Sequence, residues 1–294
     1  MARQRLGQHF LKDSHWREQI AEAIGVSRDS EGRGRAVGKE AEYCWIEIGP
    51  GHGEMTEYLA GTGRRVFAIE LDENLVASLK GLKKKFPNLE VMHGDILEID
   101  LRAVAGGRRM RVYGSLPYYI TSPILHRLFE FADVIEEIHV VVQTEVAERM
   151  AATPGSKAYG YLSVATQLNA RPEVVLEVPR AAFQPPPEVS STLVTLRLPG
   201  AWAKLREESL LPAGKVQAAE QNTGEDAFLE FVKLCFSKKR KTLVNSLRGK
   251  WNADEVRGAL TSLGLRADAR AEQISISGLA AMYAKLRLGG TLEI

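Results

Sequence analysis

The stretch YCWIEIGPGHG, residues 43–53, decides the fold of this chain. Its first half, Tyr43–Ile48, is a short apolar run that predicts a β-strand. The strand leads directly into a loop with three glycines, and a helical pattern follows over about 54–60. Glycines between a strand and a helix let the backbone approach a ligand closely, and the start of the helix presents free N–H groups. The stretch therefore predicts an α/β unit with a ligand-binding loop.

The pattern continues toward the C-terminus as an alternation of strands and helices. Further strands are expected at residues 66–69, 89–92, 111–113 and 138–143, and extended runs follow at 173–178 and 192–198. Helices are expected at about 73–85, 123–131, 145–152 and 161–168. Alternation at this spacing predicts a mostly parallel sheet that is covered on both faces. The last two extended runs have no crossover helix between them, so they can form an antiparallel pair at one edge.

The segments before the first long strand are less regular. Residues 1–12 read as a basic arm that ends in an apolar anchor. Asp13 or Ser14 is expected to cap a helix that runs to about Ile24. Residues 27–41 are rich in Gly, Arg and Glu without periodicity, and we expect a flexible connector there.

The C-terminal part has a helical pattern without strands. Apolar residues from Phe228 to Cys235 follow the i, i+3, i+4, i+7 spacing of one helix face. Later helices are expected at about 239–247, 253–263 and 276–286. We therefore expect a first domain over 1–204, a linker or insertion over 205–226 and a small helical domain over 227–294.

The overall composition excludes some classes of protein. The 294 residues carry a formal net charge of +2 and are 45% hydrophobic and 26% charged, as in an ordinary globular protein. The first residues lack the apolar core of a secretory signal, and no run approaches the roughly 18 apolar residues of a membrane span. Cys44 and Cys235 are the only cysteines and lack a metal-ligand spacing. We expect reduced thiols, no bound metal, no membrane contact and a cytoplasmic location.

Two acids follow later strands at the edge where the glycine-rich loop lies. Glu70 ends the second strand, where a carboxylate accepts both hydroxyls of a ribose. Asp95 ends the third strand, where a carboxylate accepts the amine of an adenine. These features favour a nucleoside-containing cofactor, and NAD and S-adenosylmethionine both qualify. Two observations favour S-adenosylmethionine over NAD. The loop reads GPGHG and does not match the dinucleotide-binding pattern G-x-G-x-x-G. Asp95 and Ile96 also follow the third strand, where they suit the adenine of S-adenosylmethionine.

A second group of candidate residues is Gly114–Tyr119, which follows the fourth strand. A turn of this kind brings the Ser115 hydroxyl, backbone carbonyls and the Tyr118 ring into a small space. Oxygen atoms accept the hydrogens of an amine and a ring stacks on a base, so the set suits a planar base with an exocyclic amine. The same residues also fit a common Pro-containing loop whose tyrosines pack on the core.

Taken in order, the motifs are similar to those of one known family. They are GQHFL (7–11), EIGPG (47–51), IELD (69–72), GD (94–95), LPY (116–118), SKAYG (156–160), FQPPPEVSS (183–191) and RKTL (240–243). The ordered set resembles the KsgA/RsmA-type small-subunit (16S) rRNA adenine N6,N6-dimethyltransferases over the whole chain. The resemblance implies a Rossmann-like S-adenosylmethionine-dependent methyltransferase domain with a small all-helical C-terminal domain. It also implies methylation of two adjacent adenines near the 3' end of 16S rRNA.

The resemblance assigns roles to individual residues. The cofactor contacts that it implies are His9, Leu11, Gly49, Glu70, Asp95 and Ser115, and we expect Gly51, Leu71 and Ile96 to contact the cofactor as well. The residues that it implies for the target adenine are Ser115, Leu116, Pro117, Tyr118 and Phe183. His9, Ser115 and Tyr119 stand where Asn is usual or common in the family. A serine oxygen still accepts a hydrogen bond, but it reaches less far than an amide and lacks the second amide group. Slower or altered catalysis is therefore an alternative outcome.

A basic run in the last third of the chain is expected to bind the RNA backbone. No acid occurs between Lys233 and Lys250. The candidate residues are Lys238, Lys239, Arg240, Lys241 and Arg248. Next to a methyltransferase site, RNA binding is favoured over a solvated helix face. The expected partner is 16S rRNA in the immature small ribosomal subunit, with the protein acting as a monomer in ribosome biogenesis.

Other functions are also compatible with the sequence. A large-subunit rRNA adenine methyltransferase that confers antibiotic resistance has the same chemistry. A ribosome-assembly factor with weak or altered methylation is compatible with Ser115. A DNA amino-methyltransferase is disfavoured because no separate DNA-reading domain is visible, and a nicotinamide oxidoreductase is a more distant alternative.

Overall fold

The chain forms two compact units. The computed structural model describes residues 9–28, 34–36, 43–117, 119–208, 210, 224–238 and 240–289. The first unit, here called the sheet unit, comprises Met1–Ala147 and Pro172–Leu198. The second, called the helical unit, comprises Glu148–Arg171 and Pro199–Ile294. Within the described ranges, every helix is too short or too polar to cross a membrane.

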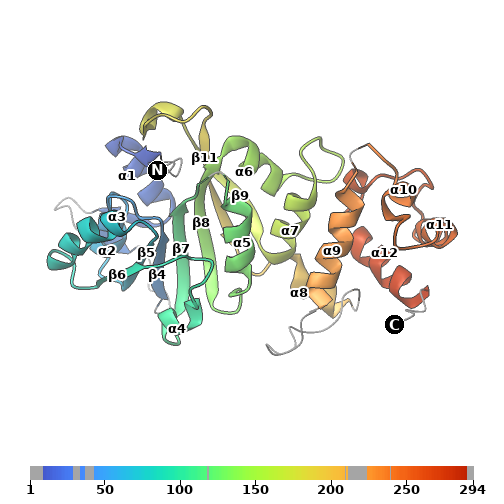
Figure 1. Cartoon of the computed structure of the whole chain (residues 1–294), viewed down its shortest axis with the longest axis horizontal. Coiled ribbons are helices and arrows are strands. Elements are labelled where there is room, and N and C mark those ends of the chain that lie inside the picture. Colours follow the sequence, from blue (N-terminus) through green and yellow to red (C-terminus); the bar gives the residue numbers. More distant parts are fainter. Residues whose placement is uncertain are drawn as a thin grey trace, which may run out of the picture. The chain divides into compact units, whose positions relative to one another are not determined.

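A seven-stranded sheet forms the core of the sheet unit (Figure 1). The strand order is β6 (Leu89–His93), β5 (Val66–Glu70), β4 (Tyr43–Ile48), β7 (Arg109–Ser115), β8 (Ile135–Gln143), β11 (Ser191–Arg197) and β9 (Arg171–Val178). The first five strands run parallel to one another, whereas β11 runs antiparallel to β8. Every residue of β4 and β5 is buried. Because successive side chains of a strand point to opposite faces, both faces of the sheet are covered there, and the predicted α/β fold is confirmed.

The described part of the sheet unit contains six α-helices, three of which start at a capping aspartate. They are α1 (Ser14–Ala23), α2 (Thr56–Gly61), α3 (Glu73–Leu79), α4 (Leu101–Ala105), α5 (Thr121–Phe129) and α6 (Thr144–Ala151), the last of which continues into the helical unit. Asp13, Asp72 and Asp100 each accept a hydrogen bond from the backbone N–H two residues ahead. The helix expected over 73–85 ends at Leu79 and continues as a 3-10 turn over Lys80–Lys84.

The expected connector over 27–41 contains regular structure. Two short strands, β2 (Val26–Arg28) and β3 (Gly34–Ala36), pair antiparallel. The flexible-connector prediction is therefore wrong for these strand residues, because backbone pairing forms there despite the absence of an apolar pattern. The rest of 27–41 lies outside the described residues.

The helical unit differs from the expected domain boundaries. Its helices are α7 (Tyr161–Asn169), α8 (Ala201–Glu207), α9 (Gly224–Phe236), α10 (Leu243–Leu247), α11 (Ala253–Ser262) and α12 (Ile276–Gly289). Leu168 on α7 and Trp202 on α8 lie in the same apolar core as Phe228 and Phe231 on α9. Helices α7 and α8 thus belong to this unit, although the sequence placed α7 and most of α8 in the first domain. The linker expected at 205–226 starts inside α8, and most of it lies outside the described residues.

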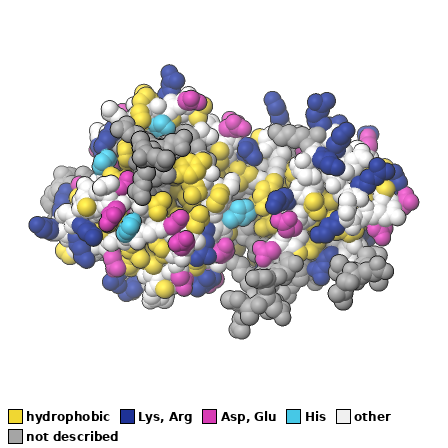
Figure 2. Space-filling view, viewed as in Figure 1, with side chains coloured by type: hydrophobic (Ala, Val, Ile, Leu, Met, Phe, Trp, Pro, Cys, Tyr) yellow, Lys and Arg dark blue, Asp and Glu magenta, His cyan; other side chains and the backbone are white. Residues whose placement is uncertain are grey.

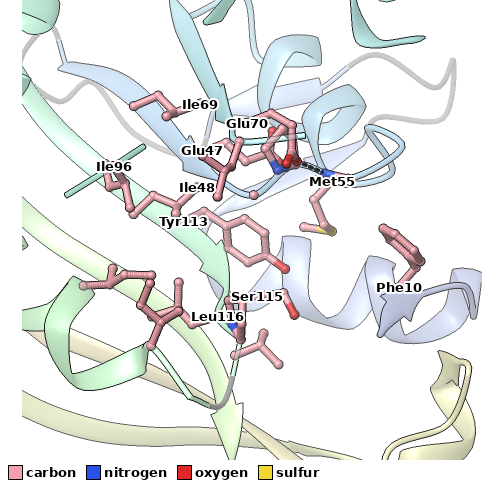
Figure 3. Close-up of a pocket in the computed structure, with 18 of the residues that line it drawn as sticks. Phe10, Glu47, Ile48, Met55, Ile69, Glu70, Ile96, Tyr113, Ser115 and Leu116 are labelled. Atoms are coloured by element: carbon pink, nitrogen blue, oxygen red, sulfur yellow. Dashed lines mark hydrogen bonds between the residues drawn. The ribbon is translucent and has the colours of Figure 1, made fainter. Parts of the chain in front are cut away.

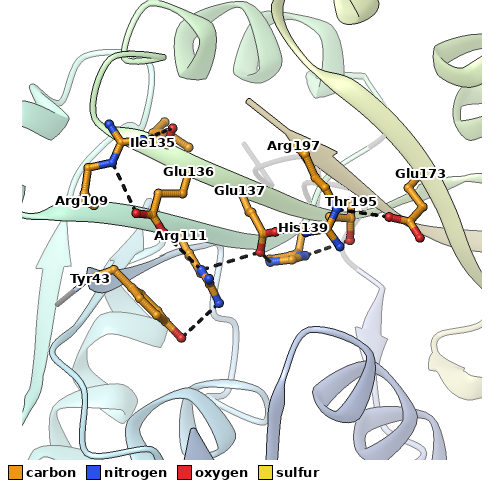
Figure 4. A network of polar contacts seen from close by, with 10 residues as sticks. All are labelled: Tyr43, Arg109, Arg111, Ile135, Glu136, Glu137, His139, Glu173, Thr195 and Arg197. Carbon is orange, nitrogen blue, oxygen red and sulfur yellow. Dashed lines mark hydrogen bonds and ion pairs between the residues drawn. The ribbon is translucent and has the colours of Figure 1, made fainter. Parts of the chain in front are cut away.

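A polar network joins the amino-terminal halves of β7 and β8 to β11 (Figure 4). The Glu137 carboxylate contacts Arg197 and lies 3.6 Å from Arg111 Nε and 3.4 Å from His139 Nε2. The His139 Nδ1 lies 2.9 Å from the Thr195 hydroxyl oxygen. Burial lowers the pKa of His139, so the ring is neutral at pH 7. The nearby His139 ring and the two arginines lower the pKa of Glu137 to about 2, which keeps this carboxylate charged.

The order of the strands places the candidate site. From β4 the chain passes outward through β5 and β6 and then returns to β7 on the other side of β4. The carboxyl ends of β4 and β7 therefore flank the switch point of the sheet. Open α/β sheets bind ligands in the crevice at such a point.

Candidate functional site

A cavity of about 170 Å³ lies at the carboxyl ends of β4, β5 and β7 (Figure 3). All nine residues predicted to contact a cofactor line it: His9, Leu11, Gly49, Gly51, Glu70, Leu71, Asp95, Ile96 and Ser115. Of the residues predicted for the target adenine, Ser115, Leu116, Pro117 and Phe183 line it as well, and Tyr118 lies outside the described residues. The two predicted groups therefore share one cavity.

The glycine-rich loop after β4 forms one wall of this cavity. Gly49 and Gly51 have φ angles of +63° and +61°, a region that side chains other than glycine rarely adopt. A Cβ atom added to Gly49 would have no neighbour within 4 Å, so the loop leaves open space beside this backbone. A Cβ added to Gly51 would lie 2.9 Å from the Phe10 ring. The loop thus keeps its backbone accessible on the cavity side and packs against the N-terminal segment.

The Glu70 carboxylate holds the loop from the end of β5. Its Oε2 accepts a hydrogen bond from the Gly51 N–H at 3.2 Å, and its Oε1 accepts one from the Asp72 N–H at 2.9 Å. Glu70 is buried, yet it lines the cavity. A carboxylate has about four acceptor positions, so two remain for hydroxyls of a ligand. Asp95 is arranged in a similar way, since its Oδ1 accepts from the Leu97 N–H at 2.9 Å.

The N-terminal segment is bound to the sheet unit beside the cavity. Strand β1 (Phe10–Leu11) pairs antiparallel with β10 (Phe183–Gln184), which brings Leu11 next to Phe183. The His9 ring donates from Nδ1 to the Pro185 carbonyl at 2.7 Å. This pairing joins residues far apart in the sequence, and it explains how the first motif of the chain reaches the cavity.

The turn after β7 presents the predicted base-binding residues. The Leu116 N–H donates to the Val141 carbonyl at 3.0 Å, which continues the β7–β8 contact. The Thr121 hydroxyl and the Ile120 N–H both donate to the Pro117 carbonyl. These bonds fix the turn and leave Ser115 at the end of the strand, where it lines the cavity.

Two further residues of the cavity had not been assigned a role from the sequence. Glu47 is only 1% exposed, and its carboxyl accepts a 2.6 Å hydrogen bond from the Thr56 hydroxyl. Tyr113 pairs with Glu47 in the β4–β7 register, and both line the cavity, where Figure 3 shows the Tyr113 ring above Ser115. Burial raises the pKa of Tyr113, so its hydroxyl stays protonated. The sequence could have indicated the place of Tyr113, because it lies two residues before Ser115 and alternate residues of a strand point to the same face.

Burial should make the stability of the protein depend on the protonation of Glu47. Burial raises the pKa of Glu47 from 4.5 to about 8, and the charges of Glu54 and Glu70 add to this shift. Between pH 4.5 and about pH 8, Glu47 is ionised in the unfolded chain but keeps its proton in the folded protein. Raising the pH through this range therefore favours unfolding.

We expect the Glu47→Gln variant to lack this pH dependence. As the pH rises from 5 to 9, the melting temperature of the wild type should fall relative to the variant by at least about 4 °C. Thermal unfolding of both proteins without ligand, across this pH range, measures the difference. Parallel curves for the two proteins would contradict the buried, protonated Glu47.

The predicted RNA-binding residues lie in the helical unit. Lys238, Arg240, Lys241 and Arg248 are exposed, and Lys239 lies outside the described residues. In the face that Figure 2 shows, Lys and Arg side chains gather over the region of α10 and α11. Arg240 has a φ of 68°, which is uncommon for a residue other than glycine. The turn between α9 and α10 thus carries several cations in direct contact with solvent.

Comparison with known proteins identifies the family. The family model for ribosomal RNA adenine dimethylase matches residues 1–206. Ribosomal RNA small subunit methyltransferase A of Koribacter versatilis is 36% identical over 97% of this chain and 94% of that protein. The protein of the same name from Acidobacterium capsulatum is 39% identical over 96% and 90%.

Two solved structures have a similar fold over nearly the whole chain. A dimethyladenosine transferase from Plasmodium falciparum has the same fold, with a TM-score of 0.69, 22% identity and coverage of 93% of this chain and 96% of that one. The 23S rRNA methyltransferase ErmE has a TM-score of 0.63 at 26% identity, with coverage of 95% and 99%. From the family model and the identity to these relatives over nearly its whole length, the chain belongs to the ribosomal RNA adenine dimethylase family.

Proposed function

We propose that this protein transfers methyl groups from S-adenosylmethionine to N6 of two adjacent adenines near the 3' end of small-subunit (16S) rRNA. The observation that carries this proposal is that one cavity is shared by the glycine-rich loop, by Glu70 and Asp95, and by Ser115 and Leu116. The two relatives reported above as small-subunit enzymes are 36% and 39% identical to this chain, whereas the 23S rRNA enzyme is 26% identical. This difference favours the small subunit as the substrate.

The residues of the cavity fit the proposed cofactor. Glu70 has acceptor positions for the two ribose hydroxyls, and Asp95 has one for the adenine amine. Leu71 and Ile96 supply apolar surface for the adenine ring. The open space beside Gly49 admits the amino-acid end of the ligand. When bound, the cofactor supplies an electrophilic methyl group on a sulfonium.

The base-binding residues would position the adenine amine. The adenine must leave its stack for its edge to be reached, and Tyr118 and Phe183 would stack on its faces. The Ser115 hydroxyl oxygen and the Leu116 carbonyl would accept the two N6 hydrogens, which directs the nitrogen lone pair at the methyl group. Because this amine is a weak nucleophile, such positioning provides most of the rate enhancement. The N6 nitrogen gains the methyl group and loses a proton, which becomes acidic on methylation, so no strong base is needed.

The proposed setting is the cytoplasm during assembly of the small subunit. The protein would act as a monomer on immature subunits, in which the target adenines are still accessible. The basic residues between Lys238 and Arg248 would contact the RNA backbone. This part of the proposal rests on the family and on the exposed cations.

A methylation assay on immature subunits tests the proposed function. The purified protein, S-adenosylmethionine and small subunits that lack the modification should yield two methyl groups on each of two adenines. Precursor large subunits serve as the matched control and should stay unmodified. Binding to the small subunit without methyl transfer would instead identify an assembly factor, and modification of the large subunit alone would overturn the choice of substrate.

The RNA contacts should make binding strongly dependent on salt. A cation that neutralises a phosphate contributes about one to the slope of log affinity against log salt concentration. We expect the double variant Lys241→Ala, Arg248→Ala to weaken RNA binding and to reduce this slope by about two. Lys84→Ala, which removes an exposed lysine of the sheet unit, is the control and should leave the slope unchanged. Titrations at several salt concentrations measure the slopes, and equal slopes for all three proteins would exclude these contacts.

A further inference from the structure

Tyr119 is an exposed aromatic residue in the lining of the cavity. It lines the cavity, yet its side chain is 64% exposed, more than any other large hydrophobic residue in the described part of the chain. Of the other aromatic rings in the lining, Phe183 is 5% and Tyr113 is 3% exposed, and Phe10 is half-buried. An exposed ring beside a ligand cavity adds little to the core of the protein, so its free surface is available to a ligand.

Tyr119 lies on the side of the cavity that is proposed to bind the substrate, not on the side that is proposed to bind the cofactor. It follows the strand that carries Ser115, and the turn between them is fixed by the hydrogen bonds to the Pro117 carbonyl. Leu71, the other exposed apolar residue of the lining, follows Glu70 on β5. The two exposed residues therefore belong to different walls, and the wall of Tyr119 is the one proposed to hold the target adenine.

We propose that Tyr119 is a stacking platform for the nucleotide next to the target adenine, an inference that rests on the proposed function. When the target base leaves the strand, its neighbour loses a stacking partner. A ring at the mouth of the cavity replaces that partner for any base, because every base has a flat aromatic face. The substrate has two adjacent target adenines, so each one would occupy the platform while the other is in the cavity.

This role demands an aromatic side chain at position 119. Tyr119→Phe keeps the ring and should bind RNA like the wild type. Tyr119→Leu keeps apolar bulk without a stacking face, and Tyr119→Ala removes both. Loss of a stacking aromatic weakens nucleic-acid binding by about 5-fold to 100-fold, so we expect about a 10-fold loss for the Leu and Ala variants. Val174→Ala, which removes an exposed apolar side chain of β9 away from the cavity lining, is the control and should have no effect.

A fluorescent base can report the stacking directly. We would place 2-aminopurine at the adenine next to the target in a small-subunit rRNA strand and measure its emission on binding, since emission is low when this base is stacked. Emission should stay low with the wild type and with Tyr119→Phe. It should rise with Tyr119→Leu and Tyr119→Ala. Binding of S-adenosylmethionine alone should be equal in all variants.

The outcomes separate this inference from the proposed function. If the wild type fails to methylate small subunits, the proposed function itself is wrong. The wild type can methylate small subunits while the Leu and Ala variants bind RNA and quench the fluorescent base as strongly as the wild type does. In that case the stacking role of Tyr119 is overturned. If these variants instead lose affinity for S-adenosylmethionine, Tyr119 belongs to the cofactor site and the platform is likewise overturned.

Discussion

Replacement of Glu70 by alanine is expected to weaken the binding of S-adenosylmethionine by at least about 100-fold. The proposed contacts are two hydrogen bonds from ribose hydroxyls to a charged carboxylate, each worth about 1.5–3 kcal/mol. A loss of about 1.4 kcal/mol corresponds to a factor of ten in affinity. The substitution also leaves the Gly51 N–H without its acceptor, so the glycine-rich loop loses its support from β5. Calorimetric titration of the purified variant with S-adenosylmethionine measures the effect.

Two further variants show whether the charge or the position of Glu70 matters. Glu70→Gln keeps the size of the side chain and one acceptor oxygen, so we expect an intermediate loss of about 10-fold. Glu73→Ala removes an exposed acid from the first turn of α3, three residues away, and should leave the affinity unchanged. Thermal unfolding of each variant identifies any general loss of structure. Wild-type affinity in a folded Glu70→Ala variant would show that the cofactor lies elsewhere.

Much of the site was predictable because it lies at strand ends. Strands buried on both faces are continuous apolar runs, so residues such as Tyr43–Ile48 and Val66–Glu70 stand out in the sequence. In a parallel sheet the carboxyl ends of the strands meet at one edge. Finding Gly49, Glu70 and Asp95 at the ends of successive strands was therefore enough to expect them close together, and all three line the same cavity.

Other parts depended on contacts that a single sequence does not reveal. The proximity of Glu47 to Tyr113 follows from the register of β4 and β7, and a shift of one residue would point either side chain to the other face. The membership of α7 in the helical unit follows from the apolar core that Leu168 shares with Phe228. Both are results of packing between segments distant in the sequence, for which local patterns carry no signal.

The second large effect is expected at Ser115, which lies at the carboxyl end of β7. Ser115→Ala removes the hydroxyl proposed to accept an N6 hydrogen, and the adenine amine is then held by the Leu116 carbonyl alone. Loss of one positioned polar group of an active site typically lowers kcat by about 100-fold or more, and we expect about 100-fold here. Affinity for S-adenosylmethionine should fall far less than the rate, because Ser115 is only one of the predicted cofactor contacts and those of Glu70 and Asp95 remain.

The Asn variant distinguishes a positioning role from a merely structural one. Ser115→Asn supplies a longer acceptor, and it should methylate at least as fast as the wild type with an equal or larger share of dimethylated adenine. Ser191→Ala removes another hydroxyl of the same cavity, one with no proposed contact to the amine, and should stay within about threefold of the wild-type rate. Single-turnover methylation of small subunits, with mono- and dimethyladenine quantified separately, measures all three variants. The proposal is overturned if Ser115→Ala keeps the full rate and the wild-type ratio of mono- to dimethyladenine. The adenine amine would then be positioned by backbone carbonyls alone, and the Ser115 side chain would take no part in the reaction.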